Sequence, residues 1–415
     1  MTVMLLSPKA LVGKVPLFRS LRYPNYRLYW LGMLATTFGN QIRLVAMLWL
    51  VYQLTGSPRD LGLVGGADGV ATIVFTLFGG VLADRVDRRR LLLVTNIIFF
   101  ILLFLLAAFT ALQLVTLWHL VVFALLFGAV GAFDGPTRQA LLPQLIGDRK
   151  DLMNAIALHS TIFQTSRIIG PSIAGLLIAA FSSAVCFFIT AAAYLAMVLA
   201  IYRIKIEKAD KVERENARGS PLEGVKYVWK NSIFSSIIGM VLVNSVFGMS
   251  FVYLMPVFAG DILKVDSRGY GLLMTFMGVG TLSGVLLGAM LGSFKKKYVL
   301  LLGGSGLYGL LLIVLAFSQD YSGAAIAIAL AGFTQHLYML TAQTIIQYLV
   351  PDGVRGRVMA IYSLVWALGP MGSLQAGAVA TYLGVPVAIA IGGAVLTSFT
   401  IFLLIAVPRL RKLDV

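Results

Sequence analysis

The stretch Gly79–Arg90 reads GGVLADRVDRRR, with four arginines and two aspartates among its last seven residues. The flanking segments, residues 69–83 and 91–133, contain no Asp, Glu, Lys or Arg. A charged side chain costs roughly 2.5 to 3.5 kcal/mol near the centre of a bilayer, so these charges belong in water and the flanks in lipid. The stretch predicts a tight, exposed turn between two hydrophobic helices, on the cytoplasmic side because it is rich in arginine.

The composition of the whole chain indicates an integral membrane protein. Of its 415 residues, 59% are hydrophobic and 12% are charged, whereas a soluble domain carries about 25% charged residues. Uncharged runs such as Leu91–Phe133 and Ile168–Tyr202 exceed the roughly 20 residues that one crossing needs. We therefore expect a multi-pass protein whose surroundings are the lipid bilayer.

The distribution of basic residues predicts the topology. The net charge is +16, and 27 of the 33 lysines and arginines lie in the two tails and in alternate loops. The opposite set of loops contains only Arg59, Lys264 and Arg268. This asymmetry follows the positive-inside rule and explains the charge without nucleic acid. We expect both termini in the cytoplasm and an even number of crossings.

Hydrophobic periodicity and helix-breaking residues predict an all-α protein with twelve transmembrane helices. All four glutamates lie between the sixth and seventh helices, so we expect a six-helix bundle over residues 1–203, a cytoplasmic linker over 204–230 and a second bundle over 231–415. The predicted helices are Tyr26–Thr55, Asp60–Ala83, Arg89–Leu112, Thr116–Ile146, Leu152–Phe181, Ser182–Arg203, Asn231–Gly260, Gly269–Gly292, Lys297–Phe317, Tyr321–Leu349, Val354–Tyr382 and Gly384–Val407.

An internal repeat supports two pseudo-symmetric halves. A shift of 209 residues, without gaps, aligns the first two predicted helices with the seventh and eighth. Parallel six-helix repeats are typical of secondary transporters, whose binding site lies near the membrane midplane between the halves. The shift places Gly39 on Gly248, Arg59 on Arg268, Gly62 on Gly271, Gly69 on Gly278 and Thr72 on Thr281.

The turn after the second helix resembles the loop signature of the major facilitator superfamily. The matching residues are Gly80, Asp84, Arg85, Arg88 and Arg89. The chain departs from the family pattern at two positions, with Asp87 in place of a glycine of the loop and Ala124 in place of an arginine of helix 4. The resemblance covers nearly the whole chain and implies the twelve-helix major facilitator fold.

A second signature lies in helix 5, where Gly170 and Pro171 are followed by Gly175. The pair resembles the Gly-Pro signature of the family's antiporters, and FDGPTRQALLPQL in helix 4 is similar to the branch of enterobactin exporters and macrolide and multidrug efflux proteins. The resemblance implies export of a small molecule by proton antiport from a bacterial inner membrane. We expect a monomer.

Enzyme chemistry is not indicated. The sequence contains no metalloprotease, nucleophile-elbow or phosphate-loop pattern, and its one cysteine, Cys186, excludes a Cys-type metal site. We expect no catalytic residues, no metal and no cofactor, with a proton gradient as the energy source.

Ionisable residues within the predicted helices are candidates for transport chemistry. On helix 1, Asn40 and Arg43 share a face, and Arg43 lies at a depth similar to that of Asp68 on helix 2. Arg43 and Asp68 could form a proton-sensitive pair or a structural pair that neutralises itself. Both alternatives remain open at this point.

Helices 4 and 5 contain a second group of candidates. Asp134 and Arg138 are one turn apart with the acid first, the favourable order. Asp134 could exchange between Arg138 and Arg167, or Arg138 could extend to the cytoplasmic surface. Gln164 lies on the same face of helix 5 as Arg167.

The second half offers neutral polar residues within its helices: Asn244, His336 and Gln343. They suit a polar, uncharged or catecholic group. His336 could relay protons or act as a packed hydrogen-bond donor.

The opening stretch itself is a candidate gate. Asp84 could cap the positive N-terminus of helix 11 near Val354, with Arg85 or Arg88 holding Asp84 in place. The equivalent position in the second half is Ser293, so we expect a one-sided gate.

The sequence thus predicts a secondary transporter that exports an amphipathic molecule, either a lipophilic drug or a siderophore. An uptake symporter and a non-transporting membrane sensor are the alternatives.

Overall fold

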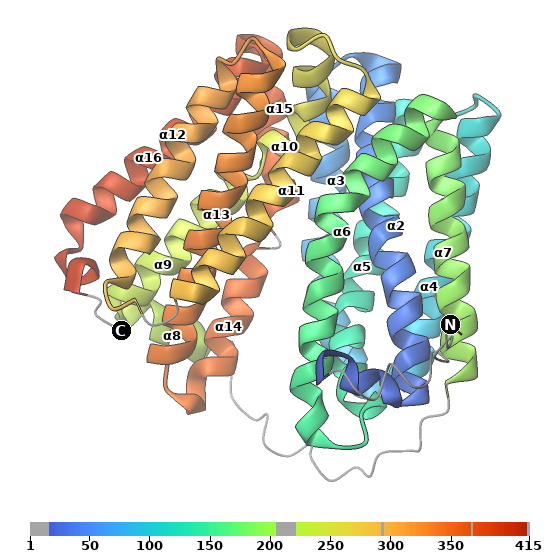
Figure 1. The fold of residues 1–415 in the computed structure, drawn as a ribbon, viewed down its shortest axis with the longest axis horizontal. Helices are drawn as coiled ribbons and strands as arrows, with labels where there is room; N and C mark the ends of the chain where they lie inside the picture. The colour runs from blue at the N-terminus through green and yellow to red at the C-terminus, as the bar shows by residue number, and fades with distance from the viewer. Residues whose placement is uncertain (1–15, 205–220, 292–293, 367, 413–415) are drawn as a thin grey trace, which may run out of the picture.

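The computed structural model describes residues 16–204, 221–291, 294–366 and 368–412, and these residues are almost entirely helical (Figure 1). Eleven helical segments of this part of the chain are long and apolar enough to cross a membrane. The 28-residue helix α3 (Pro58–Arg85) lies between the first two of them in the chain, at the position of the second predicted span. The all-α transmembrane fold is confirmed.

The N-terminal half consists of six long helices. The other five are α2 (Pro24–Thr55), α4 (Arg88–Ala111), α5 (Leu117–Leu141), α6 (Leu152–Ala180) and α7 (Ser183–Arg203). A short 3₁₀ helix, Pro16–Arg22, precedes them and is tied to the turn before α6, because Arg22 Nη2 donates to Asp151 Oδ2 at 2.5 Å.

The C-terminal half contains more interruptions. Its helices are α8 (Pro221–Lys230), α9 (Ser232–Val243), α10 (Phe251–Val257), α11 (Ser267–Met290), α12 (Gly304–Ala316), α13 (Tyr321–Leu349), α14 (Asp352–Trp366), α15 (Gly372–Leu383) and α16 (Val385–Ala406), with π-helical turns at Asn244–Gly248, Phe258–Ile262 and Val299–Gly303 and a 3₁₀ turn at Gly369–Met371.

Four predicted helices differ in form from the structure, one of them helix 9, which contains the π turn Val299–Gly303 near its start. Helix 4 ends at Leu141 rather than Ile146, because Pro143 favours a 3₁₀ turn at Leu142–Leu145. Helix 7 was expected to be continuous but contains the π turn Asn244–Gly248. Helix 11 is divided into α14 and α15 by the 3₁₀ turn Gly369–Met371, which contains Pro370, a residue with no backbone N–H to donate.

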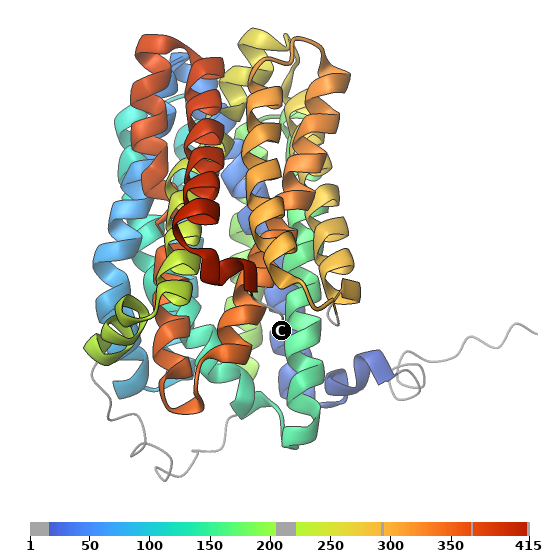
Figure 2. The same ribbon diagram turned by 90° about the vertical axis from the view of Figure 1, so that its left-hand side faces the viewer.

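The two halves form two groups of roughly parallel helices. Helices α2 to α7 lie on the right in Figure 1 and α9 to α16 on the left, and the quarter-turned view in Figure 2 places the C-terminal group in front. The groups converge at the upper end, where α3 packs on α15 and α6 packs on α11. The first and last described segments lie towards the lower side, which carries the basic loops.

Glycine allows the halves to meet backbone to backbone at the upper, outer end. A Cβ atom at Gly62 would lie 2.5 Å from the carbonyl oxygen of Ser373, and one at Gly271 would lie 2.9 Å from the Cα of Gly175. Gly62 and Gly271 are equivalent in the 209-residue repeat. Related positions thus make related contacts, Gly62 with α15 and Gly271 with α6.

Several hydrogen bonds between the halves lie in the same outer zone. Ser373 Oγ donates to the carbonyl of Gly62 at 2.9 Å, and the hydroxyls of Ser172 and Thr275 are 2.8 Å apart. Further out, the Tyr52 hydroxyl donates to Asp261 Oδ1 at 2.7 Å. The structure is therefore closed on its outer side.

Candidate functional site: buried charges and a central cavity

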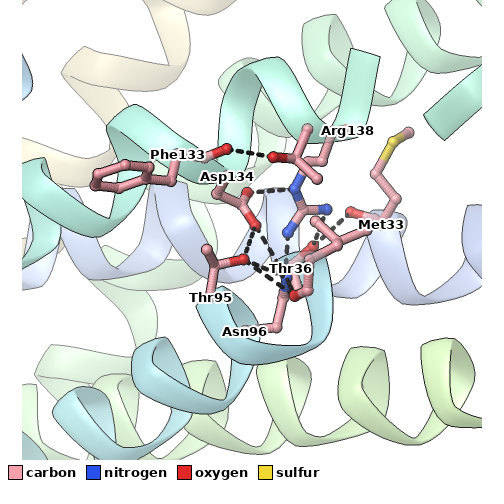
Figure 3. Close-up of polar contacts among 9 residues, drawn as sticks. Met33, Thr36, Thr95, Asn96, Phe133, Asp134 and Arg138 are labelled. Carbon is pink, nitrogen blue, oxygen red and sulfur yellow. Dashed lines mark hydrogen bonds and ion pairs between the residues drawn. The ribbon is translucent and has the colours of Figure 1, made fainter. Parts of the chain in front are cut away.

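A buried charge network fills the cytoplasmic part of the N-terminal half (Figure 3). Asp134 is 7% exposed and forms an ion pair with Arg138 one helical turn later. The second carboxylate oxygen accepts from Thr95 Oγ1 at 3.0 Å and Asn96 Nδ2 at 2.9 Å. Arg138 also donates to Asn96 Oδ1 at 3.0 Å. Each charge is therefore compensated and hydrogen-bonded, as buried charges require.

This network decides between the two expectations for Arg138. The side chain does not extend to the cytoplasmic surface, because it is 13% exposed and held between α2, α4 and α5. Asp134 forms its ion pair with Arg138, and Arg167 contacts a residue of the other half instead.

Arg43 and Asp68 form no direct ion pair in the described structure, although both lie against the same part of α5, Arg43 at Phe127 and Asp68 at Gly128. Arg43 donates to Asn40 Oδ1 at 3.1 and 3.0 Å, and its guanidinium carbon lies 4.5 Å from the ring centroid of Phe127. Asp68 is half-buried and lies one turn after Gly65, where Tyr253 of the C-terminal half packs on α3. The Asp68 carboxylate thus has fewer direct bonding partners than the carboxylate of Asp134.

A cavity of about 230 Å³ lies between the two halves. Its walls are mainly apolar, and three methionines line it on one side. Arg167, Pro171 and His336 are the predicted site residues that reach it. The full lining is Gln41, Leu44, Val45, Leu48, Arg167, Pro171, Met249, Val252, Tyr253, Tyr270, Met274, Met277, Gly278, Thr281, His336, Gly369 and Pro370.

Three polar side chains meet in the cavity wall. Arg167 Nη1 lies 3.2 Å from His336 Nε2, and His336 Nδ1 lies 3.2 Å from Thr281 Oγ1. Arginine can only donate, so His336 Nε2 accepts and its Nδ1–H donates to Thr281. His336 is therefore neutral in this arrangement and links α6 of one half to α11 and α13 of the other.

The helix 5 signature lies beside this contact. Pro171 has no N–H, so the carbonyl of Arg167 one turn earlier loses its helical partner. That carbonyl faces Gly278, where a Cβ atom would lie 2.7 Å from it. Gly170 packs on Gln41 and Gly175 on Gly271. The signature therefore shapes α6 for close packing against α2 and α11.

The remaining predicted polar residues lie away from the cavity. Asn244 is fully buried within the C-terminal half, where its Oδ1 accepts from Gln335 Nε2 at 3.3 Å. Gln164 and Gln343 are half-buried and do not line the cavity. Asn244 does not line the cavity in this arrangement, and its contact with a ligand stays a prediction.

The proposed gate is described only in part, since Ser293, the surroundings of Gly80 and the side chains of Asp84 and Arg85 lie outside the described residues. Asp87 caps α4 by accepting from the backbone N–H of Arg90 at 2.9 Å, with an ordinary φ of −61°. An aspartate thus replaces the family's glycine without strain.

The neighbouring arginines bind carbonyl groups at helix ends. Arg88 donates to the carbonyl of Ala140 at 3.0 Å, and Arg89 donates to those of Ile201 and Tyr202 at 3.0 and 2.7 Å. Cations at these positions complement the negative C-terminal ends of α5 and α7. The structure thus gives Arg88 a carbonyl partner that the gate hypothesis did not anticipate.

Sequence reasoning missed several residues of both sites. Thr95 and Asn96 partner the buried ion pair, and an asparagine within the apolar run after the arginine turn was the available signal. Gln41, Tyr253 and Thr281 of the cavity carried no comparable signal.

Comparisons with known proteins agree with this architecture. The model of a family described as transmembrane secretion effectors matches residues 16–415. The chain is 28% identical to the multidrug efflux pump Tap of Mycolicibacterium fortuitum over 391 residues, covering 91% of this chain and 94% of Tap. It is 27% identical to the staphyloferrin A transporter of Staphylococcus aureus over 349 residues, covering 84% and 87%.

Solved structures share the fold at low sequence identity. A bacterial homolog of the human lysosomal transporter Spinster, in an inward-facing and unoccupied conformation, superposes with a TM-score of 0.73 at 14% identity, covering 97% of this chain and 98% of the other. The nucleoside transporter NupG gives a TM-score of 0.71 at 12% identity, covering 92% and 98%.

Proposed function

Because the chain belongs to the transmembrane secretion effector family of major facilitator transporters, and is a secondary transporter rather than an enzyme, we propose that it exports an amphipathic small molecule by proton antiport. The observation that carries the proposal is the cavity between two halves that are closed together on the outer side. Export then requires the glycine contacts of α3 with α15 and of α6 with α11 to separate, as alternating access demands.

We assign the transported proton to Asp68. A proton carrier must gain and lose its proton during the cycle, and Asp68 has no direct ion pair in the described structure. It lies one helical turn from Gly65, against which the ring of Tyr253 packs, and Tyr253 lines the cavity. Asp134 suits this role less well, because protonation would break a compensated network.

The relatives support two substrate classes. One is a multidrug efflux pump and the other a siderophore transporter, and the apolar, methionine-containing wall suits the lipophilic part of either. The proposed transporter is a monomer in the cytoplasmic membrane of a bacterium. Its helix bundles comprise residues 1–203 and 231–415, and a cytoplasmic linker joins them.

The test is substrate-dependent proton flux in proteoliposomes, measured across a panel of dyes, macrolides and siderophores. When the substrate concentration is higher inside the proteoliposomes, we expect substrate efflux to drive protons into the vesicles for at least one compound. The absence of proton movement with every compound, under gradients of either sign, would refute the antiport proposal.

A further inference from the structure

Arg167 differs from the other arginines within the membrane-spanning helices. Arg138 has Asp134 as a direct partner, and Arg43 packs on Phe127 of α5, next to Gly128, against which Asp68 lies. Arg167 forms no ion pair in the described structure, and its partners are His336 and, at 5.5 Å, the ring of Phe163. A half-buried charge within the membrane that has no counter-ion is costly, so the presence of Arg167 needs a reason other than stability.

His336 does not supply the missing negative charge. Since Arg167 donates to its Nε2 and its Nδ1–H is directed to Thr281, the ring is a neutral acceptor. In the described part of the second half, Asp261, Asp266 and Asp320 lie at the outer ends of its helices and Asp352 begins α14 at the opposite, cytoplasmic end, so none of them lies at the level of Arg167. The described cavity wall thus carries one positive charge and no negative charge.

The polar and apolar parts of the cavity are separated along its depth. Thr281, beside His336, lies eleven residues further along α11 than Tyr270, which corresponds to about 16 Å. Between them, Met274 and Met277 line the wall, and Leu48 adds to it from α2. A molecule of matching shape has a charged group at mid-membrane and an apolar body towards the closed outer end.

We propose that Arg167 binds the anionic head group of the transported molecule, so that the cavity selects amphipathic carboxylates over amphipathic cations. The inference rests on the proposed transport function and names its substrate class. The guanidinium offers parallel N–H donors that match a carboxylate. The head group replaces His336 as acceptor, and the apolar body lies along Met274 and Met277.

Binding of three matched probes tests the proposal without any transport. The probes are 1-naphthaleneacetate, 2-(1-naphthyl)ethylammonium and 2-(1-naphthyl)ethanol, which share an aromatic body and differ in charge. Their affinities are measured by calorimetry on the full chain in nanodiscs of zwitterionic lipid. We expect the carboxylate to bind at least tenfold more tightly than the other two, with an affinity that falls as salt is added.

Variants separate the head-group contact from general effects. Arg167→Gln should weaken the carboxylate at least tenfold and change the alcohol less than twofold, and Arg167→Lys should restore part of the loss. Arg59→Gln removes the same charge from an exposed outer position and should change neither affinity. Size-exclusion profiles and unchanged alcohol binding establish that each variant is folded.

Equal or tighter binding of the ammonium probe, a carboxylate affinity that survives Arg167→Gln, or no binding of any probe would overturn the assignment. A failure of the head-group assignment can be distinguished from a failure of the proposed antiport function. Carboxylate binding that depends on Arg167 without proton-coupled flux would refute antiport alone, whereas proton-coupled export that is unaffected by Arg167→Gln would refute the head-group assignment alone.

Discussion

Replacing Gly271 by alanine should open the outer side of the protein. The new Cβ atom would lie 2.7 Å from the carbonyl oxygen of Pro171 and 2.9 Å from the Cα of Gly175, whereas ordinary contact begins at 3.4 Å. Both neighbours are backbone atoms, so α6 and α11 must separate by about 0.5 to 0.7 Å, and overpacking of this kind costs about 1 to 3 kcal/mol. Only the closed conformation bears this cost, so the open population should rise about 5- to 150-fold.

Thiol labelling from outside measures that population. Met274→Cys places a reporter in the cavity wall, and the single native cysteine, Cys186, is fully buried. An impermeant reagent added to intact cells should modify the reporter faster when Gly271→Ala is also present. Gly62→Ala should act in the same direction, because its Cβ atom would meet the carbonyl of Ser373 at 2.5 Å.

The matched control is Gly303→Ala, since no atom lies within 4 Å of a Cβ atom built there. It adds the same methyl group to a helix of the same half without a collision, so its labelling rate should equal that of the parent. Equal labelling of the Gly271→Ala and Gly303→Ala variants would refute the conclusion that glycine contacts hold the outer side closed.

Three further changes test the buried charges and the arginine turn. Asp68→Asn should abolish proton-driven export in proteoliposomes while leaving substrate exchange without a gradient intact, and proton-driven export at the parental rate would remove Asp68 from the mechanism. Asp134→Asn leaves Arg138 buried without its counter-ion and should lower the free energy of unfolding by about 3 to 5 kcal/mol. Thermal unfolding measures the loss, and Asp60→Asn, at the outer start of α3, is the control. Arg89→Ala removes the cation from the end of α7 and should cost about 0.3 to 1 kcal/mol, and a loss as large as that of Asp134→Asn would contradict a capping role.

Hydropathy was sufficient to predict the helices but not their internal breaks. Long apolar runs report how much chain can lie in lipid, and the predicted and observed spans agree to within a few residues across most of the chain. The π turns at Asn244–Gly248 and Phe258–Ile262 change the hydrogen-bond register without changing polarity. No hydrophobic pattern therefore distinguishes them from an α-helix.

In the candidate site, contacts between residues close in the sequence could be predicted, whereas contacts between distant helices could not. The Asp134–Arg138 pair followed from a spacing of four residues. The contact between Arg167 and His336 joins residues 169 positions apart, and sequence spacing does not determine which helix of the second half faces α6. Reasoning from depth alone paired Arg167 with Asp134, because depth constrains one coordinate and leaves the rotation and position of each helix open.

The position of Arg167 connects recognition to the closure of the outer side. Its carbonyl, freed by Pro171, packs on Gly278, and its side chain bonds His336 across the halves. A head group that binds this guanidinium replaces the bond to His336, and one hydrogen bond to a charged group contributes about 1.5 to 3 kcal/mol to the closed arrangement. A ligand shifts a conformational equilibrium only by its difference in affinity for the two states. When the head group replaces His336 as the acceptor for Arg167, the closed state loses a bond between the halves at the inner end of the α6–α11 contact. The ligand therefore favours the open state. The proposed binding residue therefore also holds the two halves together, so that one event both occupies the cavity and weakens the contact that must open.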